Sequence, residues 1–250
     1  MDLLHDPRRR PALVAVALVL VAVALLVVVA VRGLTGGPDC EVTVGDRTVG
    51  LTTAQAESAS VVSASSVRSG QSLPATSPAV ARAAGLSAAD AATVASALTG
   101  RARHALTCTH GGAEETESDR LDRHGLTHRA ERVRLDLDQA FGHLPDGGFA
   151  PGGVRSGHMP GSAHYEGRAI DVFVRPISPR NKAKGWAIAQ YLVANAERLE
   201  VNTVIFDARI WTARRAEEGW RDYRVSRAGR SRATVRILEH RDHVHVDVAD

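Results

Sequence analysis

His-Arg-Asp-His-Val-His-Val-Asp-Val, residues 240–248, alternates polar and apolar side chains near the C-terminal end of the sequence. In a β-strand, successive side chains point to opposite faces, so His243, His245 and Asp247 share one face and the valines share the other. Two imidazoles on a buried face need partners, because an unpaired polar group in a protein interior costs about 1–3 kcal/mol. A bound cation supplies such a partner, and ordinary hydrogen bonds are the alternative for a His-x-His pair taken alone.

A second stretch, Ser-Ala-His-Tyr-Glu-Gly-Arg-Ala-Ile-Asp at residues 162–171, offers further ligands of the same kind. His164 and Asp171 stand at the two ends of a glycine-containing bend that leads into the mostly apolar residues 170–174. Two imidazoles and one carboxylate, with a position left for water, suit catalytic zinc, whereas structural zinc usually takes four protein ligands and is often rich in Cys. No Cys is near these stretches, so together they predict a zinc site of the catalytic type.

The first of these stretches also carries a family resemblance. Its pattern Ser-x-His-x-x-Gly-x-Ala-x-Asp, followed about 70 residues later by acid-x-x-His, resembles the zinc D-Ala-D-Ala carboxypeptidases and L-Ala-D-Glu peptidases that trim bacterial cell-wall peptides. The wider group includes the lysostaphin-type endopeptidases and the hedgehog signalling domain. The resemblance covers roughly residues 126–250. It implies one zinc ion held by His164, Asp171 and His245, with Ser162 orienting a ligand or contacting substrate.

A zinc peptidase also needs a general base, for which the sequence offers three candidates. Asp242 is the first, because it precedes His245 by three positions, where the resembling carboxypeptidases carry Glu and the L-Ala-D-Glu peptidases can carry Asp. Strand alternation turns Asp242 away from His245, so this role requires a bend or bulge at the start of the strand. The alternatives are His243, which matches the first imidazole of the lysostaphin-type and hedgehog His-x-His, and Glu239, which matches the spacing of the hedgehog acid.

Other residues are candidates for substrate binding. Arg155 resembles the arginine that family members carry upstream of this motif, where a planar guanidinium stabilises an oxyanion or binds a substrate carboxylate. It is one of many arginines in the chain. Trp211 and Trp220 either line a substrate groove or pack into the core, which is the commoner place for such side chains.

Residues 12–31 form an unbroken apolar run of about 20 residues, long enough at ~1.5 Å per residue to cross a ~30 Å hydrocarbon core. A cleavable secretory signal is the alternative, but its apolar part usually spans only ~7–15 residues. Three arginines precede the run and Arg32 alone follows it closely, so the positive-inside rule leaves residues 1–10 in the cytoplasm. We therefore expect a single-pass signal anchor at residues 11–32 and an extracellular remainder.

The two cysteines of the chain, Cys40 and Cys108, both belong to the part expected outside the cell, where disulfides are stable. Two free thiols are the alternative. The pair brackets an Ala- and Ser-rich segment, residues 40–108, in which capping patterns at Thr52 and Ser87 predict the starts of two helices. This segment is therefore expected to be a small helical module tied by a disulfide. Linkers are expected on either side of it, at residues 33–39 and 109–125.

Residues 126–250 then predict an α+β domain with an antiparallel sheet, flanking helices and a zinc site. Its expected helices are residues 129–144 and 183–199, and its expected strands include residues 202–207 and 233–238.

The sequence thus predicts a membrane-anchored zinc metallopeptidase that acts outside the cell on peptidoglycan peptides, at a D,D- or L,D-type bond. The alternative is a protein of the same fold that holds the metal and binds or organises the cell wall without hydrolysis. The formal net charge is only +3, and no basic patch interleaved with aromatics is present, so no nucleic-acid partner is expected.

Overall fold

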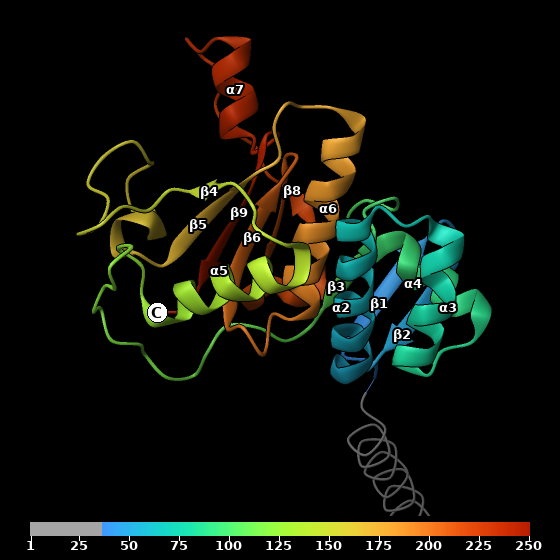
Figure 1. Ribbon diagram of the computed structural model, residues 1–250. Coiled ribbons are helices and arrows are strands. Elements are labelled where there is room, and N and C mark those ends of the chain that lie inside the picture. The colour runs from blue at the N-terminus through green and yellow to red at the C-terminus, as the bar shows by residue number, and fades with distance from the viewer. Residues whose placement is uncertain (1–36) are drawn as a thin grey trace, which may run out of the picture. The chain divides into compact units, whose positions relative to one another are not determined.

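Two antiparallel sheets organise residues 37–250, which are the residues that the computed structural model describes (Figure 1). Residues Asp39–Asp250 form one compact unit. The expected cytoplasmic tail, residues 1–10, and the expected membrane anchor, residues 11–32, lie outside the described residues. Within residues 37–250, no helix combines the length and the apolar character that crossing a membrane requires.

The smaller sheet has the strand order β2-β1-β3, with β1 at Cys40–Val44, β2 at Arg47–Leu51 and β3 at Leu106–Cys108. Gly45 makes the tight turn between β1 and β2 with a φ of 59°, a left-handed conformation that favours glycine. Cys40 and Cys108 are directly opposite each other in β1 and β3, and their sulfur atoms are bonded at 2.05 Å. The expected disulfide is confirmed.

Three helices accompany this sheet: α2 at Thr53–Ser69, α3 at Leu73–Ala84 and α4 at Ala88–Leu98. Thr52 and Gln55 form a reciprocal capping box at the start of α2, and the Ser87 hydroxyl accepts a hydrogen bond from Asp90 N at the start of α4. Both predicted helix starts are confirmed. No start was predicted for helix α3, because the residues around its start are polar and carry no apolar periodicity.

The larger sheet has the order β4-β5-β9-β6-β7-β8, with every neighbouring pair antiparallel. Its strands are β4 Asp146–Gly147, β5 Ala169–Phe173, β6 Val201–Phe206, β7 Arg209–Thr212, β8 Arg221–Asp222 and β9 His243–Val248. The last strand in sequence therefore lies at the centre of the sheet, between β5 and β6 (Figure 1). The α+β architecture with an antiparallel sheet is confirmed.

Helices α5, His128–Phe141, and α6, Pro179–Ala194, supply the apolar cover of this sheet. Val244, Val246 and Val248 of β9 are almost fully buried, and they belong to the same hydrophobic core as the apolar faces of α5 and α6. The other face of β9 carries His243, His245 and Asp247. Burial of the valines therefore fixes which face of the strand presents the imidazoles.

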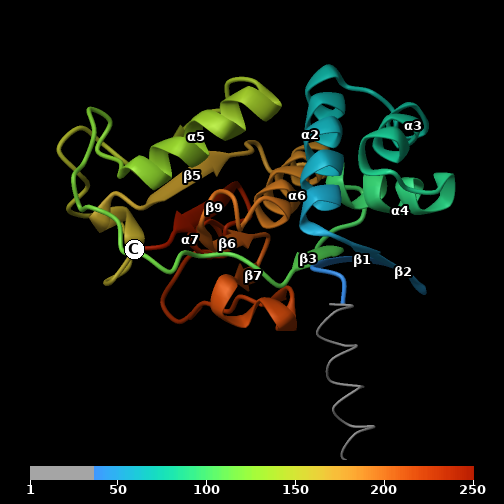
Figure 2. The ribbon, with the colours of Figure 1, turned by 90° about the horizontal axis from the view of Figure 1, so that it is seen from below.

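Helix α6 packs against both parts of the compact unit. It contacts α2 on one side and strands β6 and β9 on the other, as Figure 2 shows. Gln190 of α6 is completely buried, and its side-chain carbonyl accepts hydrogen bonds from Ala105 N and Leu106 N, both at 2.9 Å. Its amide group donates to Ala97 O at 2.7 Å. The segment expected as a helical module is thus joined to the larger sheet through the interior of the protein.

One expectation for the second half differs from the structure, and the structure decides between the two alternatives for the tryptophans. Residues 233–238, expected as a strand, belong to helix α7, Arg232–Leu238, because the Ser231 hydroxyl caps its first turn and β5 and β6 already occupy both edges of β9. Trp211 is completely buried, and the indole of Trp220 packs on Trp186 and donates to Leu106 O at 2.8 Å. Both tryptophans therefore belong to the core and not to a groove.

Gln190→Leu should lower the free energy of unfolding of residues 39–250 by about 2–4 kcal/mol, because one buried and one partly buried backbone N–H group lose their acceptor. Urea unfolding followed by circular dichroism measures the change. The exposed Gln139 of α5 provides the matched control, and Gln139→Leu should change stability by less than about 0.5 kcal/mol. Equal effects of the two substitutions would contradict the role given to Gln190.

Candidate metal centre

A short 3-10 helix, η1 at Ala163–Glu166, brings the first motif into position before β5 begins. Gly167 ends η1 with a φ of 70°, and a Cβ at this position would lie 2.7 Å from the carbonyl oxygen of Gly125. Only glycine fits both the conformation and the space. The chain therefore turns sharply after His164, and Asp171 follows on the strand.

Strand pairing brings Asp171 to the second motif. Asp171 of β5 and His245 of β9 are directly opposite each other in the antiparallel ladder, so their side chains project from the same face of the sheet. His164 reaches this pair from η1. All three residues are buried.

The three predicted ligands form a nearly equilateral triangle of donor atoms. His164 Nε2 lies 3.1 Å from His245 Nδ1 and 3.3 Å from Asp171 Oδ1, and His245 Nδ1 lies 3.1 Å from Asp171 Oδ1. Ligand atoms at ~2.0–2.2 Å from a tetrahedral zinc ion are roughly 3.3–3.5 Å apart. The spacing and the chemistry of these donors therefore fit zinc.

The opposite ring nitrogen of each imidazole has its own acceptor. His164 Nδ1 lies 2.8 Å from the carbonyl oxygen of Gly148, and His245 Nε2 lies 3.4 Å from Asp247 Oδ2. In the neutral tautomers these nitrogens donate, which leaves the lone pairs of His164 Nε2 and His245 Nδ1 directed at the triangle. A Cβ at Gly148 would lie 2.3 Å from the His164 ring, so this close support requires glycine.

The charges of the cluster are set by these contacts. Burial opposes ionisation of Asp171, but hydrogen bonds from His164 and His245 outweigh it and hold the pKa of this carboxyl well below its usual range. Burial also opposes a charge on His245, yet its hydrogen bonds to Asp171 and Asp247 raise the pKa of His245 to about 9. A bound metal ion would replace the proton of His245, because a ligating imidazole must give up that proton.

A cleft of about 590 Å³ opens over these donors. Asp171, His243 and His245 line it from the sheet, and residues 157–164, which lead into η1, and the end of α7 line it from the sides. Met159 and Ile237 are exposed apolar side chains of this lining. A substrate can therefore reach the donor triangle from solvent.

His243 and Asp242 form a hydrogen-bonded pair beside the triangle. Asp242 precedes β9, and its Oδ1 accepts from His243 Nδ1 at 2.8 Å, while its Oδ2 accepts from Arg175 Nε at 2.7 Å. Burial opposes the charge of Asp242, but these two donors lower its pKa. His243 Nε2 lies 3.7 Å from Asp171 Oδ1. His243 thus lies in the cleft, whereas both oxygens of Asp242 are occupied outside it.

The remaining predicted site residues lie in different places. Ser162 is half-buried and lines the cleft, directly before η1. Glu239 accepts from Arg227 at 2.7 Å and from Arg241 at 2.6 Å, and it does not line the cleft. Arg155 is exposed and does not line the cleft either.

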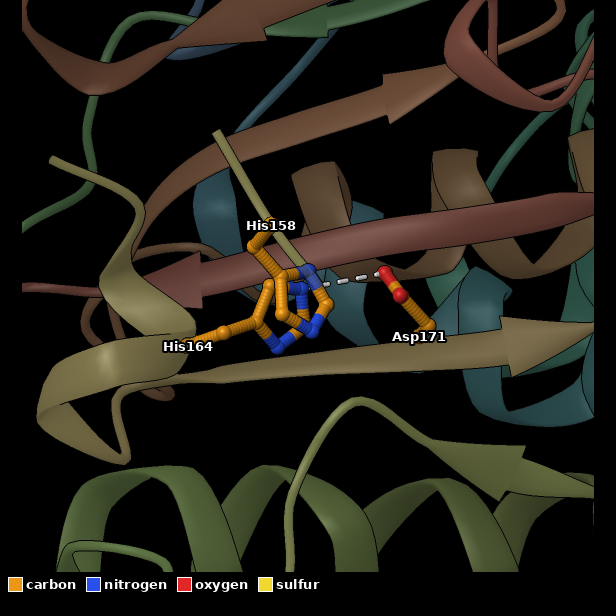
Figure 3. Close-up of side chains that lie close together, drawn as sticks. All are labelled: His158, His164 and Asp171. Carbon is orange, nitrogen blue, oxygen red and sulfur yellow. Dashed lines mark ion pairs between the residues drawn. The ribbon is translucent and has the colours of Figure 1, made fainter. Parts of the chain in front are cut away.

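His158 and His240 were not predicted as part of the site. The ring of His158 stacks on His164 with centroids 3.9 Å apart, and ligand atoms of His158, His164 and Asp171 all lie within 4.8 Å of one another (Figure 3).

His240 Nδ1 donates to Leu238 O at 2.9 Å, and its ring centroid lies 4.6 Å from that of His243. Burial, followed by the charges of His243 and His245, lowers the pKa of His240 to about 3. The sequence signal that could have identified His158 and His240 as part of the site is their closeness to the two motifs.

The donor triangle predicts that residues 39–250 bind about one equivalent of zinc. His164→Ala, Asp171→Ala and His245→Ala should each weaken zinc binding by roughly 100-fold or more, because each removes one ligand. Competition with a chromophoric chelator measures the affinity. His128, whose side chain is 86% exposed, is the matched control, and His128→Ala should bind zinc as the wild type does. Unchanged affinity in His245→Ala would instead favour the donor group of His158, His164 and Asp171.

Comparison with protein families bears on the second half of the chain. A family model described as the VldE C-terminal domain matches residues 122–235. These residues include His158, His164 and Asp171, and they end before β9 begins. No curated protein and no solved structure matched the chain. Over residues 122–235, the chain is therefore similar to the VldE C-terminal domain.

Proposed function

We propose that this protein is a zinc metallopeptidase that hydrolyses peptidoglycan stem or cross-link peptides at a D,D- or L,D-type bond. The observation that carries the proposal is the juxtaposition, in one cleft, of the donor triangle with His243, whose outer ring nitrogen is hydrogen-bonded to Asp242. The motif resemblance and the match to the VldE C-terminal domain are compatible with a peptidase-like domain. The substrate class comes from the motif resemblance.

His164, Asp171 and His245 would hold one zinc ion. A zinc ion at this position would lower the pKa of a bound water toward about 7 and polarise the scissile carbonyl. Gly148 O and Asp247 keep the two imidazoles oriented, because each accepts a hydrogen bond from the ring nitrogen that faces away from the site. The low pKa of Asp171 keeps its carboxylate anionic across the physiological range.

His243 is the base that the geometry favours, with Asp242 as its positioning residue. Asp242 Oδ1 accepts the Nδ1 proton of His243, which leaves the Nε2 lone pair directed into the cleft. This Nε2 can take a proton from the attacking water and return it to the leaving amine. Asp242 contributes by fixing the ring orientation and by stabilising the imidazolium, as a carboxylate does in other His-dependent hydrolases. The role first expected for Asp242 thus passes to its neighbour.

The proposed location is the outer side of a cell membrane, with an N-terminal anchor at residues 11–32. The apolar run of the sequence and its flanking arginines support this orientation. The Cys40–Cys108 disulfide supports it as well, because such bonds persist in oxidising compartments. Peptidoglycan peptides would be within reach of a domain held at that surface.

His243→Ala should lower kcat for hydrolysis of defined muropeptides by about 10²–10⁴-fold, because the proton acceptor is lost. Zinc affinity should stay within about threefold of wild type, since His243 is not a member of the donor triangle. Asp242→Asn should lower kcat less than His243→Ala does. Glu239→Gln should leave kcat within about twofold, because Glu239 lies outside the cleft. Product masses identify the bond that is cut.

If His243→Ala and Asp242→Asn both hydrolyse muropeptides at the wild-type rate, the proposed base is wrong. If the zinc-loaded wild type yields no product from any muropeptide, hydrolysis is not its function. Zinc binding together with pull-down by purified peptidoglycan would then favour the alternative of a wall-binding protein.

A further inference from the structure

Arg175 follows the end of β5 by two positions and lines the cleft together with His243. Its side chain is 54% exposed, so the guanidinium stands at the opening of the cleft. Arg155, the arginine expected to contact substrate, does not line this cleft. Arg175 therefore lies where Arg155 was expected to act.

Two contacts hold the guanidinium of Arg175 in place. Its Cζ lies 4.2 Å from the centroid of the Phe173 ring, and its Nε donates to Asp242 Oδ2 at 2.7 Å. Such contacts reduce the rotamer freedom that an arginine would otherwise lose on binding a ligand. The side chain is therefore organised before any ligand arrives.

The two Nη groups of Arg175 remain available. Among residues 37–250, the Arg175 side chain makes one hydrogen bond, which its Nε donates. Neither Nη atom therefore has an acceptor there. Arg168, the other arginine of the cleft, instead donates to the Val248 carbonyl and to Glu166. Paired Nη donors in one plane match the two oxygens of a carboxylate. Arg175 thus offers the cleft a preorganised fork for a carboxylate.

The position of this fork relates it to the proposed chemistry. Asp242 accepts from Arg175 with one oxygen and from His243 with the other, so a single carboxylate separates the guanidinium from the proposed base. A group bound at the Nη atoms would therefore lie near the reacting bond. Stem peptides carry carboxylates in two such places, at the C-terminus of the peptide and at the α-carboxyl of a γ-linked D-glutamyl residue.

We propose that Arg175 binds a carboxylate of the substrate close to the scissile bond, and so selects peptides with a free carboxylate over their amidated forms. The substrate class rests on the proposed function, whereas the binding step does not require turnover. Phe173 and Asp242 act in this recognition by holding the guanidinium. Arg175 is then a determinant of specificity that the family motif does not contain.

The test is equilibrium binding to the zinc-loaded protein, residues 39–250, of two pairs of ligands that cannot be hydrolysed. One pair is an N-acetylated D-Ala-D-Ala isostere in which CH2–NH replaces the scissile amide, as the C-terminal carboxylate and as the carboxamide. The other pair is an L-Ala-γ-D-Glu isostere of the same kind, as the α-carboxylate and as the α-carboxamide. The pair in which amidation weakens binding identifies the source of the carboxylate.

In at least one pair, the wild type should bind the carboxylate about tenfold more tightly than the carboxamide, as a partly exposed charge-assisted contact allows. Arg175→Ala should bring the two affinities within about twofold, and Arg175→Lys should retain part of the difference because it keeps the charge and loses the planar fork. Arg180 is exposed, also positively charged and outside the cleft, so Arg180→Ala should keep the wild-type preference.

Failure of both ligand pairs to bind, equal affinity for carboxylate and carboxamide in both pairs with the wild type, or an unchanged preference in Arg175→Ala would overturn the inference. A preference that depends on Arg175, in a protein that hydrolyses no muropeptide, would leave the inference standing and remove the proposed function. The two failures are therefore separable.

Discussion

The pairing of β5 with β9 is the constraint on which the candidate site depends. This register places Asp171 directly opposite His245, and a slip by one residue would turn the imidazoles of β9 toward the core. Such a slip is costly, because Val244 and Val246 on the opposite face are buried against the helices. The hydrophobic core thus holds the donor atoms in place, although it contributes none of them.

Polar contacts outside the donor triangle then determine how each side chain can act. The Gly148 carbonyl and Asp247 engage the outer nitrogens of His164 and His245, and Asp242 engages the outer nitrogen of His243. In each case the acceptor decides which ring nitrogen faces the cleft. The proposed division of the three imidazoles into two metal ligands and one base rests on these acceptors.

Helix α6 links this chemistry to the rest of the described chain. Its apolar side chains cover the sheet behind the site, and Gln190 replaces the missing backbone partners of Ala105 and Leu106 inside the protein. The disulfide-tied segment therefore supports the sheet through α6 and does not stand apart from it. A polar side chain is retained in this interior because every one of its hydrogen-bonding groups has a partner.

Local patterns in the sequence determined the strand alternation of β9, the spacing of His164 and Asp171 and the capping box at Thr52. They did so because period, spacing and capping are properties of short segments. Only the tertiary structure decided that Asp242 faces His243, that Glu239 and Arg155 lie outside the cleft, and that residues 232–238 form a helix. Those outcomes depend on which distant segments meet, as when β5 and β6 occupy both edges of β9. The stacking of His158 on His164 and the fork of Arg175 at the cleft are of the same kind, since no local period records a contact across the fold.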